Sequence, residues 1–536
     1  MKLSYEGLKD SAWAKAGVAL PQYDPAAMAA ETDAHPVWIH FGAGNIFRAF
    51  IARLQQTLLS AGLEKSGIVA VSTHNTALVE KVYRPFDNLT LLVSLLPDGS
   101  TEKEVIASVA RALCIHPDYP ADRQALAAMF RNPSLQMVSF TITEKGYALK
   151  DLHGNLMPEV AAELEAGPES CCNAMCVTAA MLLERYRAGG APLAVVSMDN
   201  CSHNGEKLRA SVLAVAEGWK DRGFVDDAFL AWLKNEENVS FPWTMIDKIT
   251  PRPSADIAES LTAAGIADMG LIPTDPRTNS APFVNAEKPE YLVMEDRFPN
   301  GRPPLEKAGA YLTDRNTVNK TETMKVTTCL NPLHTALAVY GCLLGYRSIA
   351  AEMKDPELTA LVRKIGYDEG LPVVVDPGIL SPRAFLDEVM TQRLPNPFIP
   401  DTPQRIATDT SQKVGVRFGE TVKKYVADPG RNAADLVGIP LAIAGWLRYL
   451  LAVDDEGHPM TCSPDPMLDT LRAQLAGVEF GRPDSAAGKL APILSNVSLF
   501  GTDLTAAGLG EKIEELFGRM LAGPGAVRQT LKSCLA

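Results

Sequence analysis

Three residues that could act together on an alcohol lie close in sequence between Lys325 and His334, where the chain reads Lys-Val-Thr-Thr-Cys-Leu-Asn-Pro-Leu-His. Lys325 can accept and return a proton, while the amide of Asn331 and the imidazole of His334 can hydrogen-bond to an alkoxide as it forms. The apolar segment 337–344 follows directly, so these groups are expected at the head of a long apolar helix. Deprotonation of an alcohol in this way also requires a hydride acceptor.

A second segment, near the N-terminal end, could bind such an acceptor. The apolar run 37–41 predicts a strand, and Gly42-Ala-Gly44 follows it. A dinucleotide needs a tight turn at this place, with no side chain where the pyrophosphate approaches the backbone and the next helix N-terminus. Phe47 occupies the position of the third glycine of the common G-x-G-x-x-G pattern. A Rossmann-like dinucleotide site is therefore expected here, and a tight structural turn in an unrelated α/β domain remains the alternative.

Polar residues after these two strands are candidates for the rest of the cofactor site. Asn45 and Arg48 begin the helix after the glycines, and Arg48 is expected to add positive charge near the phosphates. The second strand ends Val71-Ser-Thr-His-Asn75, with neither the acid that usually binds the ribose of NAD nor an arginine for NADP. Asn75 could make a weaker ribose contact. The cofactor prediction is NAD, with NADP not excluded.

The pattern of elements predicts an α/β doubly wound domain followed by a mostly α-helical domain. Runs typical of strands alternate with helical patterns from residue 37 to about 250, which favours parallel βαβ units, whereas helical patterns dominate from about 320 onward. We expect a dinucleotide-binding domain at 1–300, with a leader at 1–33, and a substrate domain at 301–536, joined by the proline-rich connection 296–304. The expected strands are 37–41, 68–72, 89–95, 137–143 and 194–198, and the expected helices include 46–61, 173–188, 331–345, 356–365, 434–453 and 513–521.

Composition narrows the classes of partner and compartment. The net charge of −13 argues against nucleic acid or an anionic membrane surface as a partner, and no apolar run approaches a membrane span or a secretory signal. The nine cysteines, an odd number scattered along the chain, fit a reducing compartment, so a cytoplasmic location is expected. Cys171, Cys172 and Cys176 form the only cluster, and small residues packing a helix explain it better than a metal site.

Several ordered motifs resemble the long-chain polyol and uronate dehydrogenases, the family that includes mannitol 2-dehydrogenase and fructuronate reductase. The resemblance covers roughly residues 37–450. In sequence order the motifs are Phe41-Gly-Ala-Gly-Asn-Ile-Phe-Arg-Ala-Phe50, Thr141-Ile-Thr-Glu-Lys-Gly-Tyr147, Ser197-Met-Asp-Asn-Cys-Ser-His-Asn-Gly205, Phe241-Pro-Trp-Thr-Met-Ile-Asp-Lys-Ile-Thr-Pro251, Glu295-Asp-Arg-Phe298 with Gly301-Arg-Pro303, and the Lys/Asn/His segment.

The resemblance implies a metal-free hydride transfer in which a lysine moves the proton. Lys325 matches the general acid/base, a role that requires burial to lower the pKa of a lysine. Asn200 and Asn331 match amides that donate hydrogen bonds to the alkoxide, and His334 matches a histidine that binds the reacting or neighbouring oxygen. Asp247 matches an acid at the edge of the substrate site.

Each of these assignments has a structural alternative. Asn200 could instead cap a helix or stabilise a turn before Gly205, and His334 could be a structural histidine whose hydrogen bonds are made within the fold. Asp247 could form a surface ion pair with Lys248. Glu144, after the fourth strand, is expected close to the nicotinamide end of the cofactor.

One departure from the family concerns the lysine. The family usually has four residues between the lysine and the asparagine, and here there are five, 326–330. In a straight helix one extra residue rotates Lys325 by about 100° relative to Asn331. Either Lys325 precedes the regular helix, which Pro332 in a first helical turn would favour, or a π-bulge absorbs the insertion. Lys320 is the alternative acid/base.

The segment 405–417 resembles the family segment that reaches over the substrate and bears on the choice of sugar. A substrate carboxylate calls for a cation, and Lys413 is the candidate, with Arg417 behind it; a solvated basic face is the alternative. The expected function is NAD(P)-dependent interconversion of a keto sugar acid and its alcohol, fructuronate and mannonate being the best match. A mannitol-type polyol dehydrogenase, a tagaturonate reductase and a non-catalytic nucleotide-binding protein remain alternatives. A zinc alcohol dehydrogenase is disfavoured by the lack of a Cys/His ligand set. The expected assembly is a monomer or small homo-oligomer.

Overall fold

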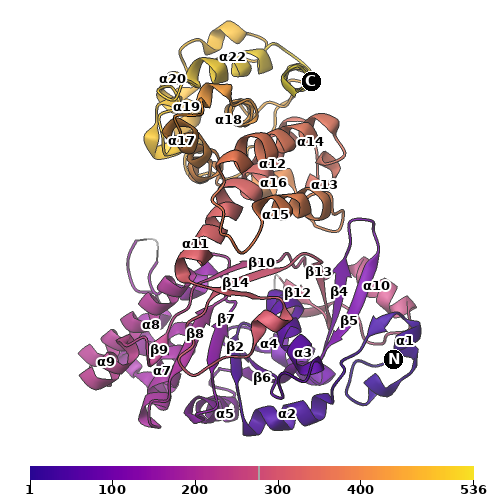
Figure 1. The fold of residues 1–536 in the computed structure, drawn as a ribbon, viewed down its shortest axis with the longest axis vertical. Helices are drawn as coiled ribbons and strands as arrows, with labels where there is room; N and C mark the ends of the chain where they lie inside the picture. Colours follow the sequence, from indigo (N-terminus) through magenta and orange to yellow (C-terminus); the bar gives the residue numbers. More distant parts are fainter. Residues whose placement is uncertain (152, 276–277, 536) are drawn as a thin grey trace. The chain divides into compact units, whose positions relative to one another are not determined.

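The chain forms two compact units in this computed structural model, which describes residues 1–151, 153–275 and 278–535 (Figure 1). The first unit runs from Met1 to Asn319 apart from Pro97–Gly99, and the second begins at Lys320. The connection expected at 296–304 lies inside the first unit, because strand β15 beyond it pairs with β14. The division falls instead within helix α11 (Arg315–Met324).

A six-stranded parallel sheet organises the first unit. Its strands lie in the order β6 (Val109–Cys114), β3 (Ile68–Ser72), β2 (Trp38–Phe41), β7 (Met137–Phe140), β8 (Leu193–Ser197) and β9 (Val239–Ser240). From β2 the chain first adds strands in one direction and then, from β7, in the other. The order therefore reverses between β2 and β7, and ligands of doubly wound sheets bind at the carboxyl ends of the strands at such a point.

The sheet is buried on both faces. Every residue of β2, β3, β7 and β8 is buried, as expected for parallel strands covered by helices on each side. Ile39 and Phe41 belong to the core formed with α5, α7 and α8, while Trp38 belongs to the core formed with α3. The apolar runs of these strands thus predicted a buried parallel sheet correctly, and the α/β doubly wound prediction is confirmed.

The apolar run 89–95 forms a strand, but in a different sheet. Strand β4 (Thr90–Leu95) pairs antiparallel with β5 (Thr101–Ile106) and parallel with β13 (Phe283–Glu287), and β1 (Val18–Ala19) pairs with β5. Its place in the sequence had suggested the doubly wound sheet, and hydrophobicity does not specify which strand is the partner. Two further sheets contain β10 (Thr244–Asp247) and β14 (Tyr291–Glu295) with β15 (Tyr311–Thr313), and the antiparallel pair of β11 (Ile272–Asp275) with β12 (Thr278–Ser280).

Helices of the first unit cover the sheet, and α7, α8 and α9 lie together beside β8 and β9 (Figure 1). Local sequence sets their ends: α7 begins after Asn173, whose side chain accepts the N–H groups of Met175 and Cys176. The helices are α1 (Ala12–Lys15), α2 (Pro25–Ala34), α3 (Ala52–Ser60), α4 (Thr76–Leu78), α5 (Pro120–Arg131), α6 (Pro158–Ala166), α7 (Ala174–Arg187), α8 (Asn204–Asp221), α9 (Asp227–Lys234) and α10 (Ala255–Ala263).

The second unit is helical, as predicted. Its centre is α12 (Asn331–Leu343), which packs against α16 and α18, and every residue of α18 is buried. The carboxylate of Glu369 caps α18 by accepting the N–H groups of Val437, Gly438 and Ile439. The other helices are α13 (Ile349–Glu352), α14 (Pro356–Arg363), α15 (Pro382–Glu388), α16 (Pro403–Ile406), α17 (Glu420–Ala427), α18 (Gly438–Tyr449), α19 (Leu468–Gln474), α20 (Ala491–Leu494), α21 (Val497–Phe500), α22 (Gly510–Met520) and α23 (Ala526–Leu535). Within the described residues, no helix has the length and apolar character needed to cross a membrane.

Candidate active site

A pocket of about 660 Å³ lies in the first unit at the carboxyl ends of three parallel strands. The loops after β2, β3 and β7 line it, together with residues of α6 and the start of α7. Because β2 and β7 are the strands between which the order reverses, this is where a doubly wound sheet binds a dinucleotide. By the same topology, the β3 side would hold the adenosine half and the loop after β7 the nicotinamide half.

The two glycines after β2 meet two different needs of this pocket. Gly42 has φ +107°, and a Cβ there would lie 2.1 Å from the carbonyl oxygen of Thr141. Its N–H donates to Val71 O at 2.9 Å, which holds the turn against β3. A Cβ at Gly44 would meet no atom within 4 Å, so this position lines open space. Gly42 thus permits a tight turn and Gly44 leaves open space beside it, which are two properties that a dinucleotide site requires.

A buried histidine of β2, His40, stabilises this turn. The ring of His40 bonds to the hydroxyls of Ser139 and Thr141 at 2.6 and 2.8 Å and stacks on Phe47 at 4.4 Å. Burial lowers the pKa of His40 to about 3, so the ring is neutral at physiological pH. Phe47 occupies the position of the third glycine in the G-x-G-x-x-G pattern. It packs on the ring of His40, which helps to position Thr141.

Arg48 does not serve the pocket, contrary to prediction. It is 1% exposed, in a π-helical turn at Phe47–Ile51, and its guanidinium donates to Thr90 Oγ1 at 3.1 Å and Ala281 O at 2.7 Å. These partners belong to the second sheet and its flanking loop, so Arg48 joins β4 and the loop before β13 to the π-helical turn that leads into α3. Sequence spacing could not indicate these partners, because they lie far from Arg48 in the chain.

The other predicted cofactor residues lie in or beside the pocket. Asn75 lines it, and its side chain accepts the N–H of Leu78, capping α4. Asn45 directly follows the lining residue Gly44 and is half-buried. Glu144 lies between lining residues 143 and 145, but its exposed carboxylate forms an ion pair with Lys207 of α8.

Asn200 follows β8 and is exposed at the carboxyl end of the sheet in the first unit. The residue before it, Asp199, is buried and bonds to the loop after β7. Asp199 was not among the predicted site residues, although an acid directly after a buried apolar strand is a signal that could have identified it.

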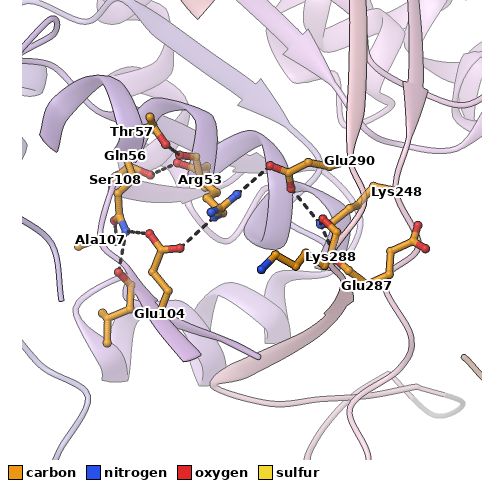
Figure 2. A network of polar contacts seen from close by, with 12 residues as sticks. Arg53, Gln56, Thr57, Glu104, Ala107, Ser108, Lys248, Glu287, Lys288 and Glu290 are labelled. Carbon is orange, nitrogen blue, oxygen red and sulfur yellow. Dashed lines mark hydrogen bonds and ion pairs between the residues drawn. The ribbon is translucent and has the colours of Figure 1, made fainter. Parts of the chain in front are cut away.

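Asp247 is the last residue of β10 and is buried. A surface ion pair with Lys248 was the alternative for Asp247. The side chain of Lys248 is buried, and its ammonium group bonds to Glu290 at 2.9 Å and to Glu287 O at 2.6 Å (Figure 2). Glu290 also pairs with Arg53 of α3 at 2.8 Å. Burial lowers the pKa of Lys248, and Glu290 opposes that shift. This network fixes the end of β10 next to Asp247.

The extra residue after Lys325 is accommodated by both devices considered for it. Lys325 begins a π-helical turn that ends at Cys329, and α12 then starts at Asn331 with Pro332 in its first turn. Leu330, with φ −133° and ψ −61°, separates the two. Lys325 is 2% exposed. Asn331 and His334 are three residues apart in one helix, so they share a face of α12.

His334 lies in a strongly charged environment in the second unit. Its Nε2 is 3.6 Å from a carboxylate oxygen of Asp401, which also pairs with Arg405. Burial lowers the pKa of His334 to about 4, against the opposing effect of Asp401, and the charges of Arg393, Arg417 and Arg405 lower it further. The imidazole is therefore neutral at pH 7 and able to bind a hydroxyl or carbonyl oxygen.

Of the two cations predicted in segment 405–417, Arg417 lies near this histidine and Lys413 lies near Arg417. Arg417 donates to the hydroxyl of Thr335, the residue after His334, and burial lowers the pKa of Arg417 to about 10. Lys413 bonds to Thr408 O, and burial together with the charge of Arg417 lowers the pKa of Lys413. The solvated basic face considered as an alternative does not describe these two half-buried groups.

Arg393 and Asp401 were not anticipated as part of this site. Arg393 ends a π-helical turn at Val389–Arg393 and is 4% exposed, and Asp401 is 6% exposed. Both are about sixty residues from His334 in sequence and meet it only through folding. A buried charged residue gives no local sequence signal, so only the structure identifies them.

The described residues contain no group of three or more His, Cys, Asp or Glu side chains placed to hold a metal ion. Cys171, Cys172 and Cys176 are free thiols; Cys171 and Cys176 are buried in the core that includes α7, while Cys172 is half-buried and lines the pocket.

Comparison with known proteins identifies the family. A family model described as the mannitol dehydrogenase Rossmann domain matches residues 37–307, and one described as the mannitol dehydrogenase C-terminal domain matches residues 317–521. The chain belongs to the mannitol dehydrogenase family. The predicted family, fold class and class of enzyme, a dehydrogenase, are thereby confirmed.

Three relatives of this mannitol dehydrogenase family member are informative. D-mannonate oxidoreductase of Thermotoga maritima is 53% identical over 99% of this chain and 98% of its own length. A substrate-free D-sorbitol dehydrogenase structure matches with a TM-score of 0.79 at 28% identity, covering 97% of this chain and 98% of its own. Mannitol 2-dehydrogenase of Pseudomonas fluorescens, in a ternary complex with NAD and D-mannitol, matches with a TM-score of 0.69 at 28% identity, covering 100% of this chain and 99% of its own.

Proposed function

We propose that this enzyme uses a nicotinamide dinucleotide to interconvert D-fructuronate and D-mannonate. The observation that carries the choice of a sugar acid is the concentration of cations around His334. The guanidinium groups of Arg393, Arg405 and Arg417 act on the histidine together with the carboxylate of Asp401, and the ammonium of Lys413 lies close enough to Arg417 for the two charges to interact. A neutral polyol needs no such charge, whereas a substrate carboxylate forms charge-assisted hydrogen bonds with it.

The T. maritima relative supports the same choice. Its name specifies mannonate as the substrate, and its similarity to this chain extends over both units. The P. fluorescens structure, which holds NAD, supports a nicotinamide cofactor for the pocket after β2. The residues of that pocket fit such a cofactor, because Gly42 permits the turn and Gly44 leaves space at the phosphate position.

The bound nicotinamide would supply or accept the hydride at the substrate carbon. In the reducing direction, we propose that Lys325 donates a proton to the carbonyl oxygen, and in the oxidising direction takes it back from the hydroxyl. Its burial is the condition under which lysine does acid–base work near neutral pH. Asn200 and Asn331 are proposed to donate hydrogen bonds to the developing alkoxide, and neutral His334 to bind an oxygen beside it.

The first test follows oxidation of NADH and NADPH separately by fructuronate, tagaturonate and fructose. Rapid oxidation by fructuronate supports the proposal. A preference for fructose would favour a polyol dehydrogenase, and a preference for tagaturonate would assign the other uronate. Cofactor binding without turnover of any of the three would contradict the proposed activity.

The second test concerns the carboxylate partner. Lys413→Ala should lower kcat/KM for the uronate by about 10- to 100-fold, because a hydrogen bond to a charged group contributes ~1.5–3 kcal/mol. The same substitution should change kcat/KM for a neutral ketose by less than about threefold, which is below ~0.7 kcal/mol. Arg431→Ala is a matched control, since it removes a cation of the same unit that pairs with Asp428. Equal losses on the acid and the neutral sugar would contradict the role of Lys413.

A further inference from the structure

The carboxylate of Asp199 connects the ends of two adjacent strands on the nicotinamide side of the pocket. It follows β8, and its two oxygens accept the N–H groups of Ile142 and Thr143, both at 2.9 Å, in the loop after β7. The hydroxyl of Tyr147, at the far end of the same loop, donates to it at 2.5 Å. One buried carboxylate thus receives three donors from residues 142–147, a loop whose members line the dinucleotide pocket.

The loop held in this way has a strained backbone. Thr143 has φ 65° and ψ 159°, a region that residues with a side chain rarely adopt and that costs about 1–3 kcal/mol. Such a conformation persists only when its surroundings impose it. The two N–H bonds to Asp199 lie at and directly before the strained residue, so they are placed to impose it.

The main chain of Asp199 is itself fixed by a separate set of bonds. Its carbonyl accepts the side-chain amide of Asn204 at 3.0 Å and the N–H of Cys201 at 2.9 Å. Asn204 is 1% exposed, and the same amide bonds to Thr244 of β10. Asn200 lies between these anchored residues. The side chain of Asp199 therefore holds the loop after β7, while its main chain holds the turn that carries Asn200.

We propose that Asp199 is a positioning residue for the hydride transfer. It holds the loop at the nicotinamide end and the turn that carries Asn200 in a fixed position relative to each other. This inference rests on the proposed function, in which Asn200 binds the alkoxide. Misplacement of reacting groups by about 1 Å costs about 100-fold in rate, so a clamp on both segments affects turnover more than cofactor affinity.

The test uses Asp199→Asn, which keeps the size of the side chain but replaces one acceptor oxygen by an N–H donor facing other donors. We expect kcat to fall at least tenfold, the Kd for NADH to change less than threefold, and amide exchange at Ile142 and Thr143 to accelerate in the cofactor-free protein. Ser211→Ala is the matched control. It removes one hydrogen bond to the same loop, at Tyr147 O, without touching Asp199, and should change kcat less than threefold.

A double-mutant cycle separates positioning from a general loss of structure. Glycine adopts the backbone conformation of Thr143 without strain. The fold-reduction in kcat that Asp199→Asn causes should therefore be at least three times smaller in a Thr143→Gly background than in the wild type. Equal reductions in both backgrounds, an unchanged kcat in Asp199→Asn, or unchanged amide exchange would each overturn the proposal. If the wild type reduces no uronate, the proposed function fails, while amide exchange in the cofactor-free protein still decides whether Asp199 holds the loop.

Discussion

Replacing Gly42 by alanine tests whether the turn after β2 is the structural basis of the dinucleotide pocket. The new Cβ would lie 2.1 Å from Thr141 O, where real Cβ atoms essentially never approach within 3.0 Å, so the backbone must move by roughly 0.9 Å. Thr141 cannot yield freely, because its hydroxyl is held by His40 and its N–H by Phe41 O. The positive φ adds about 1–3 kcal/mol of strain and the overpacking about 1–3 kcal/mol, which gives a loss of about 2–6 kcal/mol.

The assay combines thermal unfolding with NADH binding, and Gly44→Ala supplies the control. At ~2–4 °C per kcal/mol, a loss of about 2–6 kcal/mol in Gly42→Ala should lower the Tm of the first unit by roughly 4–24 °C and weaken NADH binding. Gly44 lines the same pocket, but its Cβ would meet nothing within 4 Å. Gly44→Ala should therefore leave the Tm unchanged while weakening NADH binding at least tenfold, about 1.4 kcal/mol.

The two variants together can refute the reasoning. A Gly42→Ala protein with the wild-type Tm would show that the turn tolerates a side chain. A Gly44→Ala protein with wild-type NADH affinity would show that the phosphates bind elsewhere.

Two further predictions concern the second unit. Lys325→Ala should lower kcat by about 100- to 10,000-fold with NADH binding retained, as expected for general acid/base catalysis. If Lys325→Ala stays active and Lys320→Ala loses activity, the assignment of Lys325 as the acid/base is wrong. Burial raises the pKa of Glu352 to about 9, Asp355 adding to the effect, and neither oxygen of this buried carboxyl has a hydrogen-bond partner among the residues that the structure describes. The folded state therefore binds this proton more tightly than the unfolded state, so stability declines by ~1.4 kcal/mol per pH unit between about 4.5 and 9. Relative to the wild type, Glu352→Gln should gain on the order of 4 kcal/mol in free energy of unfolding between pH 5 and pH 8.5, and a pH-independent difference would contradict the assignment.

The sequence by itself determined the features that depend on neighbours in the chain. Buried apolar runs specified four strands of the parallel sheet, and Gly42 and Gly44 specified the turn, because tight backbone geometry restricts residue type locally. Pro332 marked the first turn of α12 for the same reason, since it tolerates only that part of a helix. The ordered motifs placed the chain in its family, and with it the candidate residues for catalysis.

Tertiary structure alone decided which distant residues meet. Arg48 was expected at the phosphates and instead bonds to Ala281, 233 positions away. His334 acquires Asp401 as a neighbour, and Asp199 reaches Thr143 across adjacent strands. These contacts arise from strand order, π-helical turns and helix packing, which set the direction of each side chain. Hydrophobic periodicity specifies that a residue is buried, but the partner it meets depends on elements that are remote in sequence and adjacent only in the folded protein.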